Sequence, residues 1–173
     1  MRVIDNFLPD YQFKLLSSII LGDEFSWYWN DKILEPEDKY YNPKDYQFTH
    51  TFFDRDPPVN GESSIYYELI KNSSIFSLLG VNQLYKIKAN LNPRTFFKRF
   101  HGWHSDYPAK NGFEPGKTAI LYINTNNGYT KFKKGGKVKS VANRMVIFDP
   151  HIQHAGYTCT DEKMRVVVNF NYV

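Results

Sequence analysis

The last ten residues, "MRVVVNFNYV" (164–173), predict a β-strand, because β-branched and aromatic residues dominate the stretch and neither glycine nor proline interrupts it. Strand alternation places Arg165, Val167 and Asn169 on one face. A guanidinium that faces an otherwise apolar interior is costly unless it meets a carboxylate, which its fork of donors can bind in bidentate fashion. The stretch therefore indicates both a β-rich fold and an anion site inside it.

A series of further strand candidates precedes this final strand, from Gln83 onward. They are "LYKIKANL", "TFFKRF", "TAILYIN", "GYTKF", "KVKSV" and "NRMVIFD". Segments such as "NTNNG" and "KKGG" predict turns between several of them. The second half of the chain is thus expected to be a run of short antiparallel strands.

Helix signals are concentrated in the first half. A helix is predicted from about Pro9 to Gly22, a second over "ESSIYYELIKN" (62–72), and a short third one in "SSIFSLLG" that ends at Gly80. Residues 30–62 lack a sustained period and predict long loops around a short strand near "YQFTHTFF", which leaves open whether they form a lid.

Helices followed by strands favour a mainly β fold with flanking helices, a jelly roll or sandwich. At 173 residues one domain is expected, with residues 1–82 packing on a sheet built from 83–173.

Charge is unevenly distributed along the chain, although the net charge is only +4. Residues 1–85 hold 7 Lys/Arg against 13 Asp/Glu, residues 86–144 hold 13 against 2, and residues 145–173 hold 2 against 3. The basic middle segment fits two interpretations. It is either the solvated surface of basic hairpins or a field that attracts an anionic substrate, nucleic acid or an acidic polypeptide.

The single cysteine, Cys159, cannot form an internal disulfide and is expected to be a small buried residue rather than an iron ligand. Apolar runs such as "AILYI" are far shorter than the roughly 20 residues of a membrane-spanning helix. The sequence therefore predicts a cytoplasmic protein without a membrane partner.

The stretch "HGWHSDYP" (101–108) holds the first candidate metal ligands. His104 and Asp106 are two positions apart, so in an extended segment both side chains point to the same side and can converge on one cation. This pair is a weak signal alone, because His-x-Asp arises often by chance. Trp103 and Tyr107 around it fit an aromatic pocket wall or ordinary packing equally well.

A third ligand is available in "PHIQHAGYT", where either His151 or His154 could complete the set. Two histidines and one carboxylate form the facial triad of non-haem Fe(II) oxygenases, which leaves coordination positions open for substrate chemistry. His154 is favoured, because Ala and Gly follow it where the chain must turn near a metal, whereas His151 directly follows Pro150. His151 and His101 then become surface or supporting residues, and His50 a surface or core residue.

A second donor to the anion is predicted in "TAILYIN". Alternation puts Tyr122 on one face with Thr118, Ile120 and Asn124, and its phenol could donate to the carboxylate that Arg165 binds.

The order of these motifs resembles the Fe(II)/2-oxoglutarate-dependent dioxygenases, most closely the prolyl 4-hydroxylase-like branch. The motifs are His104-x-Asp106, "LYIN", Gly128 before a basic hairpin, "NRMVIFDPHIQHAG" and Arg165. Compact phage-encoded members are similar from about residue 83 to the C-terminus, and the opening "VIDNFL" is also typical of them.

The resemblance implies a cupin-like double-stranded β-helix in which His104, Asp106 and His154 bind iron. It also implies that Arg165 pairs with the distal carboxylate of 2-oxoglutarate, and that Tyr122 and Asn90 help to hold this co-substrate.

The expected activity, with Fe(II), 2-oxoglutarate and molecular oxygen, is hydroxylation of a C–H bond with release of succinate and carbon dioxide. The first expectation for the substrate is a prolyl or other residue of a polypeptide, and the host cytoplasm is the compartment if the gene is a phage gene. Three alternatives stay open: oxidation of a nucleobase or nucleic acid, a metal-binding cupin that does not use 2-oxoglutarate, and a non-catalytic jelly-roll module.

Overall fold

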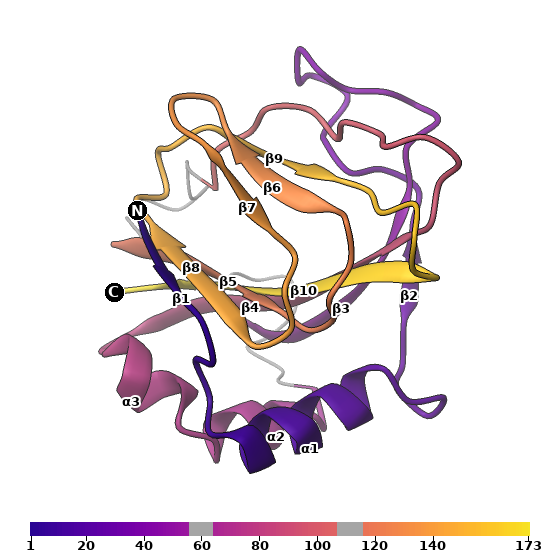
Figure 1. Cartoon of the computed structure of the whole chain (residues 1–173). Coiled ribbons are helices and arrows are strands. Elements are labelled where there is room, and N and C mark those ends of the chain that lie inside the picture. Colours follow the sequence, from indigo (N-terminus) through magenta and orange to yellow (C-terminus); the bar gives the residue numbers. More distant parts are fainter. Residues whose placement is uncertain (56–63, 107–115) are drawn as a thin grey trace.

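Three layers make up the protein in a computed structural model that describes residues 1–55, 64–106 and 116–173. Helices lie on one side of a large antiparallel sheet, and a smaller sheet faces the other side of it (Figure 1). This arrangement gives the large sheet one face toward the helices and one face toward the small sheet.

In the part of the chain that the structure describes, the large sheet has seven strands, in the order β1, β8, β5, β10, β4, β3, β2. Their bounds are β1 Arg2–Ile4, β2 Tyr28–Asn30, β3 Gln47–Asp54, β4 Leu84–Pro93, β5 Lys117–Tyr122, β8 Arg144–Phe148 and β10 Met164–Tyr172. The small sheet has the order β7, β6, β9, with bounds β6 Tyr129–Phe132, β7 Lys137–Lys139 and β9 His154–Tyr157. The final strand, β10, lies at the centre of the large sheet between β5 and β4.

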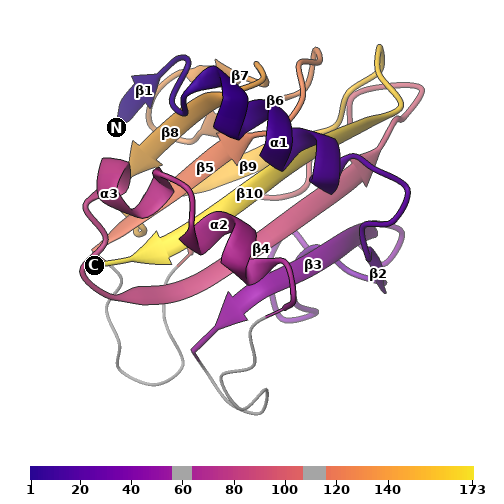
Figure 2. The ribbon, with the colours of Figure 1, turned by 90° about the horizontal axis from the view of Figure 1, so that it is seen from below.

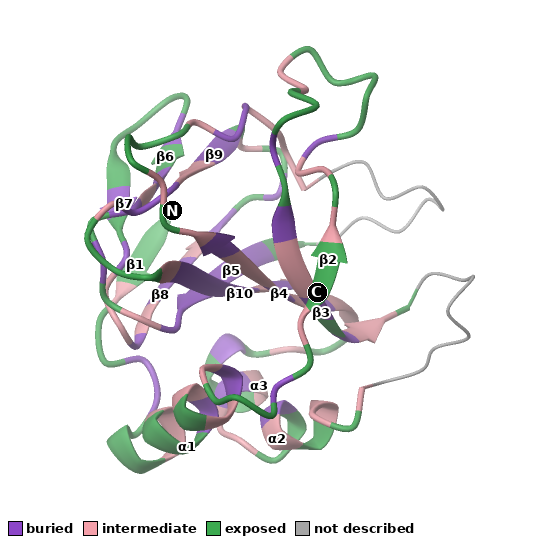
Figure 3. Cartoon of the chain, turned by 90° about the vertical axis from the view of Figure 1, so that its right-hand side faces the viewer, coloured by how far each residue is buried: buried purple, intermediate pink, exposed green. Residues whose placement is uncertain are grey.

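Among the described residues, three helices cover the outer face of the large sheet: α1 Asp10–Ile20, α2 Tyr67–Lys71 and α3 Ile75–Leu79 (Figure 2). Their apolar sides meet residues such as Val166, Val168 and Phe170 of β10 in the main core. The sides turned away from the sheet are largely exposed (Figure 3). α1 and α3 confirm the predicted helices. α3 ends at Leu79 and is capped by Gly80, whose φ of 68° suits a residue without a side chain.

The face of β10 that points away from the helices borders the space between the two sheets. Tyr122 of β5, Phe148 of β8 and Val167 of β10 pack there against Phe132 and Val138 of the small sheet. Two antiparallel sheets that enclose one interior form a jelly roll, which confirms the predicted double-stranded β-helix with flanking helices.

The predicted strand "TFFKRF" (95–100) is wrong. Phe96 and Phe97 are both highly exposed, so the segment lacks alternation, and only Phe100 forms an isolated bridge, with Tyr157. A side chain interrupts the ladder here, because the Arg99 N–H donates to the hydroxyl of Thr158 at 2.8 Å. Side-chain hydroxyls that compete for backbone donors disfavour regular pairing.

The first half of the chain contributes more strands than expected. β1 and β2 were not predicted, and with β3 they form both edges of the large sheet. The predicted helix over 62–72 is shorter, since α2 begins at Tyr67; its first two predicted residues, 62 and 63, lie outside the described residues. β9 was not predicted either, because Ala155 and Gly156 indicate a turn after His154 rather than a strand.

In the part of the chain that the structure describes, no helix is long and apolar enough to cross a membrane. Cys159 is buried and its thiol contacts the carbonyl of Glu162 at 3.5 Å, in line with a small core residue.

Candidate metal centre

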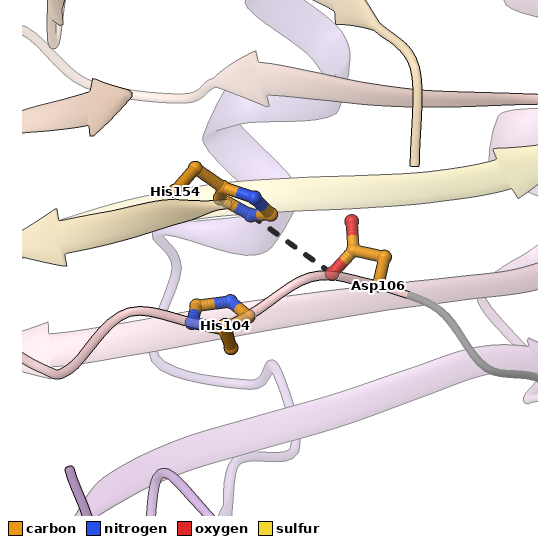
Figure 4. Close-up of side chains that lie close together, drawn as sticks. All are labelled: His104, Asp106 and His154. Atoms are coloured by element: carbon orange, nitrogen blue, oxygen red, sulfur yellow. Dashed lines mark ion pairs between the residues drawn. The ribbon is translucent and has the colours of Figure 1, made fainter. Parts of the chain in front are cut away.

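His104, Asp106 and His154 form a cluster in which one ligand atom from each lies within 4.8 Å of the others (Figure 4). His104 and His154 are bridged by two backbone hydrogen bonds, of 3.0 and 2.9 Å, which puts their side chains on the same side. Their ring centroids are 4.5 Å apart. Of the two histidines proposed as third ligand, only His154 joins the cluster, whereas His151 is exposed.

Each histidine of the cluster points its Nδ1 atom at a backbone carbonyl. His104 Nδ1 is 3.3 Å from the oxygen of Gly102, and His154 Nδ1 is 3.1 Å from the oxygen of Ile152. A carbonyl oxygen only accepts, so each Nδ1 carries a proton and the neutral ring keeps its lone pair on Nε2. This orientation by backbone carbonyls is the usual support of metal-binding histidines.

The surroundings of His154 favour its neutral form. The ring is buried between Phe132 and Phe148, and this burial lowers the pKa of His154 while the nearby Asp106 partly raises it. A neutral imidazole is the form that binds a metal.

Asp106 has one carboxylate oxygen without a hydrogen-bond partner among the described residues. Its Oδ1 lies 3.9 Å from His154 Nε2, while Oδ2 is buried and unpaired. A buried polar atom left unpaired costs about 1–3 kcal/mol. A cation between the carboxylate and the two Nε2 atoms would remove this cost, so the three side chains fit a metal ion.

Arg165 lies on the face of β10 that borders the space between the two sheets, and it is 3% exposed. Its Nε donates to the Ser140 hydroxyl at 3.0 Å, and its Nη2 donates to the Thr130 hydroxyl at 3.0 Å. The Tyr122 hydroxyl donates to the same Thr130 oxygen at 2.8 Å. Sequence reasoning identified Arg165 and Tyr122 but missed Thr130 and Ser140, which approach Arg165 only in the folded chain.

Arg165 has no carboxylate partner among the described residues. Burial lowers the pKa of Arg165, but a guanidinium stays charged in proteins. Burial also raises the pKa of Tyr122, which keeps the phenol a neutral donor. A buried cation beside a neutral donor is a site that fits a carboxylate.

Two glycines lie beside the Arg165 side chain, and only at Gly128 would an added Cβ clash with it. A Cβ at Gly128 would lie 2.7 Å from Arg165 Cδ, and a Cβ at Gly156 would lie 3.7 Å from both Arg165 Nη1 and His101 Nδ1. His101, expected at the rim, is buried. Burial and then repulsion from Arg165 lower the pKa of His101 to about 3, so this ring is uncharged.

Asn90 and Asn92 of β4 share the inner face with Arg165. Asn90 lies opposite Val167, and Asn92 lies opposite Arg165 in the register of β4 and β10. Asn90 is half-buried, whereas Asn92 is 4% exposed and its Nδ2 has no hydrogen-bond partner among the described residues. Asn92 was missed, although alternation from Asn90 could have found it.

The remaining candidates that the structure describes, His50 and Trp103, lie apart from the cluster. His50 is a buried core residue whose ring nitrogens are 2.7 Å from the Ser26 carbonyl and 2.7 Å from the Ser64 hydroxyl. Trp103 packs against Phe100 at a centroid distance of 5.4 Å. Tyr107 lies outside the described residues.

Neither a model of a known protein family nor a curated protein sequence matches the chain. Several solved structures are similar to it. A 2OG-Fe(II) oxygenase family oxidoreductase from Burkholderia pseudomallei is 9% identical, with 98% of this chain and 83% of the other covered and a TM-score of 0.66.

Two prolyl hydroxylases are similar as well. The viral collagen prolyl hydroxylase of Paramecium Bursaria Chlorella virus-1, solved as its 2OG complex, is 14% identical, with 99% and 95% covered and a TM-score of 0.57. A Trichoplax adhaerens prolyl hydroxylase, solved with a fragment of the hypoxia inducible factor oxygen degradation domain, is 12% identical, with 99% and 82% covered and a TM-score of 0.60. At these identities the likeness establishes a shared fold.

Proposed function

We propose that this protein is an Fe(II)- and 2-oxoglutarate-dependent dioxygenase that hydroxylates a C–H bond of its substrate. The observation that carries the proposal is the buried Arg165 guanidinium, which lacks a carboxylate partner among the described residues and shares one interior with the His104, Asp106 and His154 cluster. A dicarboxylic acid that reaches from the cluster to Arg165 satisfies both sites.

The proposed metal ligands are His104 Nε2, His154 Nε2 and the Asp106 carboxylate. Three protein ligands on one side leave positions for the co-substrate and oxygen, as in other 2-His-1-carboxylate iron sites. The metal with 2-oxoglutarate and oxygen supplies the oxidising power for hydroxylation, and 2-oxoglutarate leaves as succinate and carbon dioxide.

The chain's own residues bind and orient the co-substrate in this proposal. Arg165 neutralises the distal carboxylate, and Tyr122 can turn its hydroxyl from Thr130 to the same oxygen. Asn90 and Asn92 border this space from β4, and the unpaired amide of Asn92 is a free donor for it. The aromatic rings of Phe132 and Phe148 exclude water on the side of His154.

A prolyl or other residue of a polypeptide is the proposed substrate. Support comes from the similar structures that are prolyl hydroxylases, one of them solved with a peptide fragment. A nucleic acid is the second candidate, favoured by the basic middle segment of the chain. A non-catalytic jelly-roll module is less well supported, because it assigns no role to the buried Arg165 charge, which lacks a carboxylate partner among the described residues, or to the unpaired Asp106 oxygen.

Succinate formation tests the proposal. Purified protein with Fe(II), 2-oxoglutarate and oxygen is expected to release succinate slowly alone and faster with a substrate, either proline-containing peptides or single-stranded oligonucleotides. Mass spectrometry then identifies which of them gains one oxygen atom. His154→Ala should abolish succinate formation, whereas His151→Ala, three residues away and exposed, should retain it. Equal rates in wild type and His154→Ala contradict the proposal.

A further inference from the structure

The outer face of the small sheet is uncovered in the described structure. All three helices lie beyond the large sheet, on the far side of the molecule (Figure 1). Strand alternation turns Thr130 and Phe132 of β6 inward and leaves Tyr129 and Lys131 outward, and in β7 it leaves Lys137 and Lys139 exposed around the buried Val138.

Like charges lie opposite each other on this face. The register of β6 and β7 pairs Lys131 with Lys137, and Tyr129 with Lys139. Like charges directly across an antiparallel pair destabilise the sheet. None of these three lysines forms an ion pair with a carboxylate of the described residues. The Lys131–Lys137 pair is therefore unfavourable, and a bound external anion would reduce the repulsion between the two ammonium groups.

Aromatic rings lie among these cations. Tyr129 stacks on Tyr157 of β9 at a centroid distance of 4.5 Å, and the ammonium groups of Lys137 and Lys98 lie 4.9 and 5.4 Å from the centre of the Tyr129 ring. Lys98 also donates to the carbonyl of Asn127 at 2.7 Å. These contacts join the loop "RTFFKR" (94–99) to the edge of the sheet.

That loop exposes two phenylalanines between basic residues. Phe96 is 90% exposed and Phe97 is 75% exposed, with ring centroids 4.8 Å apart. We call the combined surface the basic aromatic face; it consists of Phe96, Phe97, Lys98, Tyr129, Lys131, Lys137 and Lys139. Two neighbouring exposed aromatic rings form an apolar patch, and exposed apolar patches often mark interaction sites.

We propose that the basic aromatic face binds single-stranded nucleic acid. Its phosphates would neutralise the lysines, and its unpaired bases would stack on Phe96 and Phe97, the combination by which proteins hold single strands without reading sequence. An acidic polypeptide would satisfy the lysines but not the two rings, and duplex bases are not available for stacking. The lysines of β6 and β7 lie on the outer side of the sheet whose inner side carries His154, so their substitution leaves the proposed metal ligands in place.

Fluorescence anisotropy with a labelled single-stranded oligonucleotide of mixed sequence tests the proposal. Lys131→Glu with Lys137→Glu should weaken binding about tenfold or more, and it should reduce the slope of log K against log salt by about 1.4, since two phosphate contacts are lost. The matched control, Lys14→Glu with Lys71→Glu, changes the net charge equally on the helices α1 and α2 and should bind within about twofold of wild type.

The aromatic contribution is tested separately. Phe96→Ala with Phe97→Ala should weaken binding roughly tenfold without changing the salt slope, because stacking carries no counterion release. Lys131→Glu alone should raise the urea midpoint of unfolding, since it creates an opposite-charge pair with Lys137, while it weakens oligonucleotide binding.

Three results overturn the proposal. One is no binding at low salt, and another is equal loss in both charge-reversal pairs. The third is displacement of the oligonucleotide by poly-glutamate at equal charge with no effect of the phenylalanine substitutions, which identifies an acidic polypeptide as the partner. Succinate formation without added substrate in the Lys131→Glu, Lys137→Glu protein reports on the proposed function alone, so the two failures are distinguishable.

Discussion

Gly128 illustrates how the absence of a side chain shapes the anion site. Its hypothetical Cβ would lie 2.7 Å from Arg165 Cδ and 2.9 Å from the carbonyl oxygen of Tyr157. Contacts this short force Arg165 to move or the backbone to shift. The absence of a Cβ at Gly128 therefore leaves room for the Arg165 side chain in its observed position.

Gly128→Ala is expected to reduce stability by about 1–3 kcal/mol through overpacking and to raise at least tenfold the 2-oxoglutarate concentration needed for half-saturation. Metal affinity should change little, because the ligands lie elsewhere. Gly136→Ala is the matched control, since its Cβ meets nothing within 4 Å. Unchanged co-substrate affinity in Gly128→Ala contradicts the assignment of Arg165.

His50 gives a pH dependence unrelated to the metal cluster. Burial lowers its pKa below the ordinary value of 6.5, so folding favours the neutral ring. Its contribution is present in full above pH 6.5 and decreases as the pH falls through 6.5 toward the lower folded pKa. In urea unfolding, His50→Gln should be less stable at neutral pH and lose less stability than wild type on acidification. Parallel curves for the two proteins would exclude this role.

At the scale of elements, Asn143 connects the N-terminal segment to β8. It has a φ of 61°, and its side chain both accepts from the Leu8 N–H and donates to the Leu8 carbonyl, each at 2.9 Å. Its own backbone carbonyl accepts from the Phe7 N–H at 2.9 Å. One residue thus fixes the turn between β1 and α1 against the sheet.

Asn143→Ala is expected to reduce the free energy of unfolding by about 3 kcal/mol, because two buried hydrogen bonds are lost and alanine tolerates the left-handed conformation poorly. Asn143→Gly should recover about 1 kcal/mol of this, since glycine removes only the conformational strain. Urea denaturation measures both. Equal losses for the two variants would mean that backbone conformation contributes nothing.

Length alone did not decide whether the sequence predicted a strand, because the short β6 and β7 were predicted from "GYTKF" and "KVKSV" beside turn signals, whereas β1, β2 and β9 were missed. β4, β5, β8 and β10 are five to ten residues long, and their composition is clear. β1, β2 and β9 have three or four residues, and pairing with distant strands stabilises them, as Phe132 pairs with His154. "TFFKRF" failed for the opposite reason: it has strand composition, but its two phenylalanines remain exposed.

At the scale of the whole molecule, the predicted site residues come together from four separate segments. His104, Asp106 and His154 form one cluster, and Tyr122 and Arg165 both meet Thr130. Motif order and strand alternation predicted that these five side chains would face a common interior. The supporting residues could not be predicted, because Thr130, Ser140 and Asn92 reach Arg165 only through the pairing of strands and the facing of the two sheets.

Without a bound metal, the cluster of His104, Asp106 and His154 is expected to lower the free energy of unfolding. Asp106→Ala removes a buried, unpaired carboxylate oxygen, so with chelator present the variant should be at least as stable as wild type. With Mn(II) at a hundredfold excess over its dissociation constant, wild type should gain about 2.7 kcal/mol by mass action, and the variant much less. Urea unfolding with and without Mn(II) measures both effects. A less stable variant in chelator would indicate a structural role for Asp106.

The most direct test of the proposed site is an anaerobic titration with Fe(II) and then 2-oxoglutarate, followed by the weak charge-transfer absorption in the visible range. Wild type and His151→Ala should show the band, His154→Ala should lose it, and Arg165→Ala should need at least tenfold more 2-oxoglutarate. No band in wild type, or an equal band in His154→Ala, would contradict the assignment of the cluster as an iron and 2-oxoglutarate site.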